Sequence, residues 1–383
     1  MKKLTSAMIK ARAKEIGLDD IGIAPIERYK DAPPTMNPAN YFPGAKSVIV
    51  TVQRITRGSY RGIEEGTHWN NYTFYSYNRL NTYFRPRLTY AIASFVEDHG
   101  WEAVPHYPGV PERNPNREPV TPGRLPPDVV PSVRFLAAGA GVGEIGWSKV
   151  FLHPKFGPRV RLGSIFTDAE LEPDDMIEPG TICNRCGACA RKCPGAIPAV
   201  NSGQTITINI GGKDIVYGDV DMGKCTFTHH GLNNRVSPFL KKDFPNLEFD
   251  VASSNATEEE AYKLCYALAG ANWSRTPFNP DGKAINQYPF TTRMAGGYFA
   301  LCGARGCIRA CMDSLEKSGR IEQTFETPFY RKPSWDLDYR REKPVGKVNP
   351  WWEDYLTKQG LDRNINKGPN YNIHEYKQRA GEE

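Results

Sequence analysis

Four cysteines crowded into eleven positions constrain this chain more than any other feature. They stand at Cys183, Cys186, Cys189 and Cys193-Pro194, and so fit the pattern C-x2-C-x2-C-x3-C-P. This spacing lets three thiolates from one tight loop hold three corners of an iron–sulfur cube, while the fourth thiolate faces a second cluster. Zinc sites usually separate two C-x2-C pairs by a dozen or more residues, so the pattern favours iron–sulfur clusters over zinc.

A second group of cysteines supplies the ligands that the first group lacks. Cys302, Cys307 and Cys311 form a looser C-x4-C-x3-C pattern, and Cys225 stands between the two groups. The simplest allocation makes two clusters with four thiolates each. Cluster one takes Cys183, Cys186, Cys189 and Cys311, and cluster two takes Cys193, Cys225, Cys302 and Cys307. The ninth cysteine, Cys265, is interpreted as a buried thiol in a helix, because free cysteine is among the most buried residue types. The alternative exchanges Cys265 for Cys225 as a ligand.

Composition indicates an ordinary globular protein. The chain has 383 residues, of which 39% are hydrophobic and 24% charged, with a net charge of +6. This mild excess of positive charge allows weak attraction to nucleic acid or to an acidic protein and proves neither. We see no apolar run long enough to span a bilayer and no twin-arginine pair near the N-terminus, so we expect a cytoplasmic, reducing setting in which the cysteines are not a disulfide set.

The pattern of residues predicts a mixed α/β (α+β) chain. Residues 7–16 are expected to form a helix capped by Ser6, residues 20–26 and 45–54 to form strands, and residues 75–99 to form a long helix kinked at Pro86. We further expect a proline-rich crossing, two strands and a β-hairpin, in this order: 105–131, 149–153, 159–167 and 205–217.

Three regions follow from this pattern. We expect a core over residues 1–174, a cluster-bearing region over 175–325 with an inserted segment, 228–300, that lines the substrate pocket, and a tail over 326–383. The aromatic tail either wraps the surface or contacts a partner, and a homodimer is one such contact. The adjacent His229 and His230 in the insertion would point apart on a strand, so we place them in a surface loop.

A glycine-rich turn precedes the cysteines. Gly141, Gly143 and Gly146 satisfy G-x-G-x-x-G, the dinucleotide fingerprint, which should follow a strand and open a helix. Here a predicted helix precedes the glycines and a predicted strand follows them. We therefore reject a nicotinamide-binding interpretation and infer only that the backbone approaches something closely at this turn.

The order of the motifs resembles one family. The stretch AGVGEIGWSKVFLHPKFGPRVRLGSIFTDAEL, followed by the cysteine run, a lone cysteine and a second cysteine group, is similar to the corrinoid-dependent reductive dehalogenases and their relatives, the epoxyqueuosine reductases. The resemblance covers roughly residues 75–312. It implies a nitroreductase-like core that holds base-off cobalamin, joined to a ferredoxin-like domain with two 4Fe–4S clusters.

The resemblance also assigns residues to the corrinoid. It places the glycine turn beside the ring and the FGPRVR hairpin near the nucleotide tail, where arginine forks suit a phosphate. Arg159 and Arg161 lie two apart on one side of a strand, which a solvated strand face would also explain. The assigned residues are Gly141, Gly143, Gly146, Phe156, Gly157, Arg159 and Arg161.

A proton donor is the last part that the resemblance implies. Dehalogenases use a tyrosine helped by a nearby cation, and Tyr83 lies nearest the family's position among Tyr75, Tyr77, Tyr83 and Tyr90. The family's cation is replaced here by Trp147, and Lys149 is a possible substitute. In the queuosine branch an aspartate in D-x-x-P is the acid, and Asp128 matches that pattern; it equally suits the start of a helix.

The resulting hypothesis is a corrinoid and iron–sulfur reductase that removes halogen from an organohalide. Its electron donor would be ferredoxin, flavodoxin or a separate reductase. The alternatives are a tRNA-modifying enzyme of the epoxyqueuosine reductase type and an electron-transfer protein with two clusters and no corrinoid. Nucleic-acid binding is not expected, because the excess of positive charge is small.

Overall fold

Four antiparallel strands form the central sheet of the protein in the computed structural model, which describes residues 3–68, 70–106, 117–127, 129–195, 204–233, 236, 250–273 and 302–329. The strand order is β1-β2-β6-β3. Their bounds are β1 (Asp20–Pro25), β2 (Ser47–Arg54), β3 (Ala103–Pro105) and β6 (Val160–Thr167). The first six residues of β2 are all buried, because this strand lies between two neighbours and under a layer on each face.

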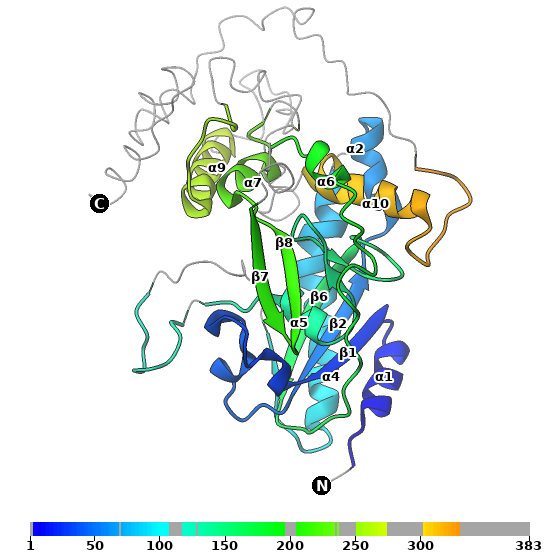
Figure 1. Ribbon diagram of the computed structural model, residues 1–383, viewed down its shortest axis with the longest axis vertical. Helices are drawn as coiled ribbons and strands as arrows, with labels where there is room; N and C mark the ends of the chain where they lie inside the picture. The colour runs from blue at the N-terminus through cyan, green and yellow to red at the C-terminus, as the bar shows by residue number, and fades with distance from the viewer. Residues whose placement is uncertain are drawn as a thin grey trace, which may run out of the picture.

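The two faces of the sheet are covered by different segments. On one face, Ile49 and Ile165 pack with α1 (Ser6–Glu15) and α4 (Arg85–Glu97). On the other face, Val50 and Phe166 pack with α5 (Val133–Gly139) and with the hairpin of β7 (Thr205–Ile210) and β8 (Lys213–Gly218). Figure 1 shows this hairpin beside α5 and the sheet. The hydrophobic core therefore joins residues from before and after the first cysteine motif.

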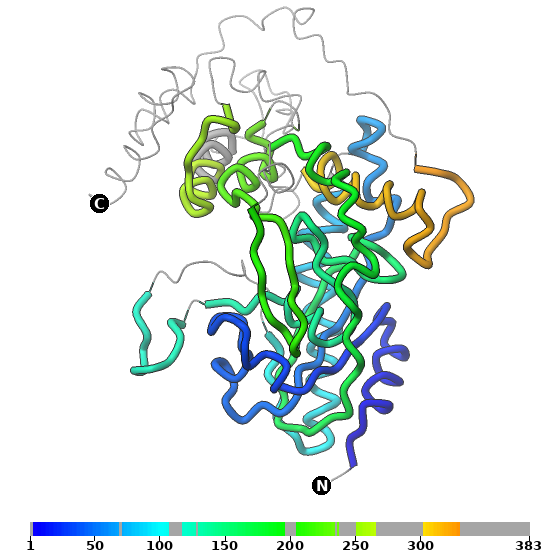
Figure 2. Tube along the Cα trace, viewed as in Figure 1, coloured from blue at the N-terminus to red at the C-terminus, as the bar shows by residue number. Residues whose placement is uncertain are grey.

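Short helices gather beyond one end of the sheet, at the top of Figure 1, and the trace in Figure 2 shows how many separate chain segments meet there. They are α2 (Arg61–Glu65), α3 (Asn70–Tyr72), α6 (Ala188–Arg191), α7 (Met222–His229), α9 (Glu258–Trp273) and α10 (Cys307–Ser318), with a 3-10 turn at Cys302–Ala304. All of the cysteines lie in this region or in the loop that leads to it. Within the described ranges, the helices are too short or too polar to cross a membrane.

Most of the predicted elements are confirmed. The helix at 7–16 corresponds to α1, the strands at 20–26 and 45–54 to β1 and β2, and the hairpin at 205–217 to β7 and β8. The predicted strand at 149–153 is reduced to β5 (Phe151–Leu152), which pairs with β4 (Glu144–Ile145). The predicted cap of α1 is wrong: Thr5 accepts the N–H of Met8, while the hydroxyl of Ser6 donates to the carbonyl of Glu172.

The long helix predicted over 75–99 is also corrected. Regular α-helix begins only at Arg85, and Pro86 lies in its first turn, where a missing N–H costs nothing. The preceding Thr73–Asn78 and Leu80–Phe84 are π-helical. Such wide turns often occur at functional sites. Parts of the proline-rich crossing (107–116 and 128), much of the insertion (234–235, 237–249 and 274–300) and most of the tail (330–383) lie outside the described residues.

Candidate functional site

The first set of cysteines lies where α6 meets α10. Cys183 and Cys186 stand in the loop before α6, Cys189 lies on it, and Cys311 lies on α10. Burial raises the pKa of the Cys311 thiol well above its usual value, and the neighbouring charges of Cys189, Cys183 and Cys186 raise it further. The thiol of Cys311 is therefore near the other three, as the allocation to cluster one requires.

The second set lies deeper, beside the first. Burial raises the pKa of Cys302 and of Cys307 well above the usual value, and both are raised further by Cys193 and Cys225. The pKa of Cys225 rises to about 12, through burial first and then through Cys193. Cys307 also feels Cys189 and Cys311, so the two sets are adjacent. For Cys265 burial alone raises the pKa, which separates it from the other thiols.

The donor sets suit two four-iron cubes, which take one thiolate at each iron. In the described part of the chain, no three His, Cys, Asp or Glu side chains converge as ligands of one metal ion would. Ligation by these two sets remains a prediction. The grouping of the thiols is nevertheless the one that the motif spacing predicts, and it places Cys225 rather than Cys265 with the second set.

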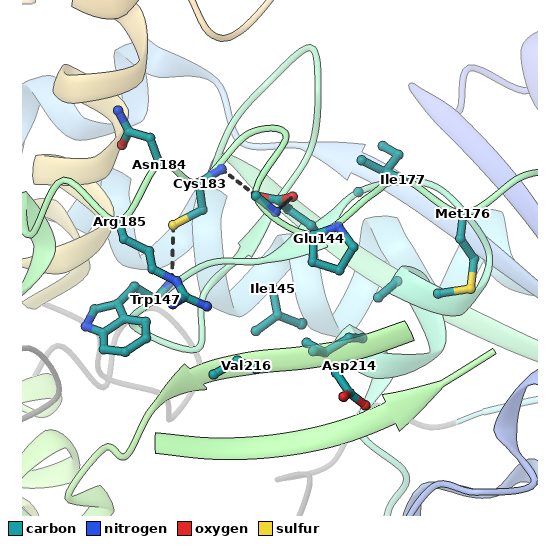
Figure 3. A pocket seen from close by; sticks show the side chains of 15 residues that line it. Glu144, Ile145, Trp147, Met176, Ile177, Cys183, Asn184, Arg185, Asp214 and Val216 are labelled. Atoms are coloured by element: carbon teal, nitrogen blue, oxygen red, sulfur yellow. Dashed lines mark hydrogen bonds between the residues drawn. The ribbon is translucent and has the colours of Figure 1, made fainter. Parts of the chain in front are cut away.

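The glycine-rich turn packs against the loop of the first set. The Glu144 carboxylate, 4% exposed, accepts the N–H of Gly180 at 2.9 Å and that of Ile182 at 3.1 Å, and also accepts the N–H of Cys183. The N–H of Trp147 donates to the Cys183 sulfur at 3.3 Å (Figure 3). Burial raises the pKa of Glu144, although these backbone hydrogen bonds favour its charged form. The turn thus holds the start of the cysteine loop.

The glycines themselves are required by the chain's own backbone. A Cβ at Gly143 would lie 2.1 Å from the carbonyl oxygen of Leu152, and one at Gly141, whose φ is +76°, would lie 2.2 Å from that of Asp175. Gly146 would similarly meet Leu152. The turn follows α5 and leads into β4, so it is not the strand-to-helix turn of a dinucleotide site.

Removal of the Glu144 charge should loosen the first cysteine loop. In Glu144→Gln the amide group faces three backbone N–H donors and can no longer accept from all of them, which should cost about 3 kcal/mol of unfolding free energy. We expect faster loss of iron to a chelator and a lower unfolding midpoint. Glu178→Gln is the matched control, because Glu178 lies on the same loop with its side chain 75% exposed. Equal iron loss from both variants would contradict the role of Glu144.

The residues that the resemblance assigns to the corrinoid make contacts with other residues of the chain. Arg159, 1% exposed, donates to the Ile55 carbonyl at 3.0 Å and to the Gln323 side chain at 2.5 Å. Arg161 donates to the carbonyls of Ser76 and Val160. Phe156 is buried, and Gly157, with φ +58°, adjoins Leu315 and Ile321.

A pocket lies beside the glycine turn. A pocket of about 280 Å³ lies between the glycine turn, the cysteine loop and β8, lined among others by Glu144, Trp147, Cys183 and Asp214 (Figure 3). The assigned glycines and arginines contact the chain itself in this structure, and their binding of a corrinoid stays a prediction.

The predicted proton donors are separated by the structure. Tyr83 is 50% exposed and its ring contacts Phe84. Lys149, with φ +62°, places its ammonium group 5.6 Å from the centre of the Tyr217 ring. Asp128 lies outside the described residues. The structure does not bring Tyr83 and Lys149 together as a tyrosine and its cation.

A different tyrosine has a cation beside it. The Arg161 guanidinium lies 4.1 Å from the centre of the Tyr77 ring. Burial raises the pKa of Tyr77, and Arg161 partly opposes this rise, while Cys307 and Cys302 add to it. Tyr77 therefore lies close to the second thiol set. Sequence reasoning named Tyr77 only as one of four tyrosines, and nothing in the spacing singled it out.

The two histidines complete this cluster. His229 ends α7, its ring 4.9 Å from that of Tyr77, and its pKa falls to about 4 through burial first and then through Arg161. His230 is 1% exposed, with its ring 5.0 Å from that of Tyr262. Placing the pair in a surface loop is therefore wrong. At the end of a helix, unlike on a strand, two adjacent side chains can both face the interior.

Comparison with known proteins gives partial matches. No protein-family model matches the chain. It is 43% identical over 65 residues to the tetrachloroethene reductive dehalogenase of Sulfurospirillum multivorans, a match that covers 16% of this chain and 13% of that protein. It is 41% identical over 61 residues to the enzyme of the same name from Desulfitobacterium hafniense, which covers 15% of this chain and 11% of that protein. The matched segments are thus a small part of these relatives.

Solved structures are similar at a lower level. A reductive dehalogenase, described with a mechanism for B12-dependent dehalogenation, has a TM-score of 0.40 and 21% identity, covering 58% of this chain and 28% of that one. An epoxyqueuosine reductase with a modified tRNA stem loop has a TM-score of 0.37 and 16% identity, covering 81% and 79%. The sequence matches over 65 and 61 residues confirm the resemblance to the reductive dehalogenases that the motifs predicted.

Proposed function

We propose that this protein is an iron–sulfur reductase of the reductive dehalogenase type. The observation that carries the proposal is the position of the second thiol set, which adjoins the cluster of Tyr77, Arg161 and His229 on one side and the first thiol set on the other. A relay that ends beside a tyrosine, a cation and a neutral histidine suits a reduction that consumes electrons and a proton.

The reaction proposed is replacement of a carbon–halogen bond by a carbon–hydrogen bond. An organohalide takes up two electrons and one proton and releases a halide ion, so that atoms and charges balance. The electrons would arrive singly through cluster one and then cluster two. Cobalamin is part of the proposal on the strength of the resemblance alone, because the residues assigned to it contact the chain itself.

Tyr77 is the best candidate for the proton donor. A phenol must stay protonated until it is used, and burial keeps the pKa of Tyr77 raised. When the proton leaves, the Arg161 cation over the ring stabilises the phenolate. His229, neutral at neutral pH because its pKa is about 4, adds no charge that would compete with Arg161. Tyr83 is a weaker candidate, since half of its side chain is exposed.

The test is anaerobic loading of the full chain with iron, sulfide and a cobalamin, followed by metal counts and EPR. About eight irons and one base-off cobalt per chain, with halide release from an organohalide, would support the proposal. About eight irons without cobalt or halide release would overturn it in favour of an electron carrier. Turnover of an epoxyqueuosine-containing tRNA stem loop, with affinity that falls steeply with salt, would replace it by the tRNA-modifying alternative.

A further inference from the structure

The first thiol set reaches the surface at one residue. Of the eight predicted ligands, Cys186 is exposed and the other seven are buried or half-buried. Its sulfur lies 3.3 Å from the hydroxyl oxygen of Ser314 on α10. Long-range electron transfer is favoured where a donor can come closest to the cluster, and here that place is the surface around Cys186.

Basic residues flank this exposed thiol in the sequence. Arg185 precedes it, and Arg191 and Lys192 follow at the end of α6; all three side chains are exposed. Within the described residues, none of the three forms an ion pair.

A groove runs between α6 and α10. Its volume is about 380 Å³, and its lining includes Lys192, Lys317, Asp313 and Ser314. Asp313 is the acid in this lining, and it is already paired with Lys317 at 2.8 Å and with Arg309 at 3.8 Å. The lining of the groove therefore carries net positive charge, and Ser314 in this lining contacts Cys186.

We propose that the α6–α10 groove, lined by Lys192 and Lys317 and with the exposed Arg191 next to Lys192 at the end of α6, is the docking surface for a small acidic protein that donates single electrons. The inference rests on the proposed function, since it needs cluster one to be present. The step is a single outer-sphere electron transfer. The donor is oxidised by one electron, the four-iron cluster is reduced by one electron, and no bond forms or breaks. Opposite charges would steer the encounter and raise its rate.

The test uses charge reversal on the iron-loaded full chain. In the double variant Arg191→Glu, Lys192→Glu, we expect the second-order rate of cluster reduction by a reduced acidic [2Fe–2S] ferredoxin to fall at least tenfold at low salt. The fall should shrink as ionic strength rises above about 0.1 M, where the Debye length is about 10 Å. Lys14→Glu is the control, because this exposed lysine lies on α1, at the other end of the molecule (Figure 1).

Reduced methyl viologen, a positively charged electron donor, is the control for the rate of cluster reduction. The double variant should react with it as fast as the parent or faster, which would exclude a damaged cluster as the cause of slow reduction by ferredoxin. Equal rates with ferredoxin in all three proteins would overturn the proposal. A variant that slowed with both donors in equal ratio would also overturn it, since the charge would then act on the cluster and not on docking.

A second measurement needs no variant. Carbodiimide joins lysines to the carboxylates of a bound acidic protein, and we expect the ferredoxin cross-links at Lys192 and Lys317. Cross-links confined to Lys14 or other distant lysines would contradict the docking surface. Cluster reduction and cross-linking do not depend on turnover, so a protein that loads iron and docks ferredoxin but releases no halide would refute the proposed function and leave this inference standing.

Discussion

Replacing Cys225 by serine should lower the iron content from about eight to about four per chain, whereas replacing Cys265 by serine should leave it at about eight. The two residues are a matched pair, because each is a cysteine on a helix of the same region. The pKa of Cys225 responds to burial and to Cys193, and that of Cys265 to burial alone. Cys225 therefore has thiol neighbours with which to share a cluster.

The measurement is an iron and sulfide count with EPR of the reduced protein after identical anaerobic loading. The parent should show the interaction of two neighbouring paramagnetic clusters, and Cys225→Ser the signal of cluster one alone. Reduction of any substrate should be lost in Cys225→Ser, because the relay is cut between the surface and Tyr77. If Cys265→Ser loses four irons and Cys225→Ser does not, the alternative allocation is the correct one.

Removing the hydroxyl of Tyr77 should lower turnover by about 10²–10⁴-fold while both clusters stay in place. Tyr77→Phe keeps the ring that Arg161 covers and that contacts His229, so the packing should survive. The hydroxyl group is removed, and with it the hydrogen bond to Tyr72. The control is Tyr83→Phe, which should retain turnover within about twofold, because half of the Tyr83 side chain lies in solvent.

Two measurements separate a loss of proton donation from a loss of electron delivery: the rate of halide release under excess chemical reductant, and the rate of cluster reduction. For Tyr77→Phe we expect slow halide release and unchanged cluster reduction. A larger solvent-deuterium effect in the parent than in the variant would further identify a protein-borne proton. Loss of turnover in Tyr83→Phe with full activity in Tyr77→Phe would return the role of donor to Tyr83.

Chemical spacing rules made the cysteines the most predictable part of the site. A four-iron cube needs four thiolates, so the two motifs and Cys225 could be combined without a structure, and in the structure the pKa of Cys302 responds to Cys307, Cys193 and Cys225, and that of Cys311 to Cys189, Cys183 and Cys186. The strands could also be predicted from the sequence, because β2 consists largely of β-branched residues, which are buried on both faces of the sheet. Local chemistry and periodicity carry this information.

The remaining residues of the site carry no such signal. Glu144 is a single acid inside a glycine motif, and its role comes from three N–H groups that lie about forty residues further along the chain. Tyr77 differs from its neighbours only by meeting Arg161, which stands on a distant strand. The glycines indicate close backbone approach, and the family resemblance assigned them to a corrinoid, whereas the neighbours that the structure shows, Leu152 and Asp175, cannot be read from the sequence.

The hairpin of β7 and β8 has a consequence for how the protein is made. Ile208, Ile215 and Tyr217 complete the core around Phe135 and β2, yet they follow the first four cysteines in the chain. During synthesis that face of the sheet stays uncovered until residue 218 has left the ribosome, and contacts so distant in sequence form slowly. The predicted ligands Cys302, Cys307 and Cys311 follow the hairpin in the chain, so this face can be covered before either predicted cluster has all of its ligands, and a chain that stops before residue 218 should aggregate whether or not iron is supplied.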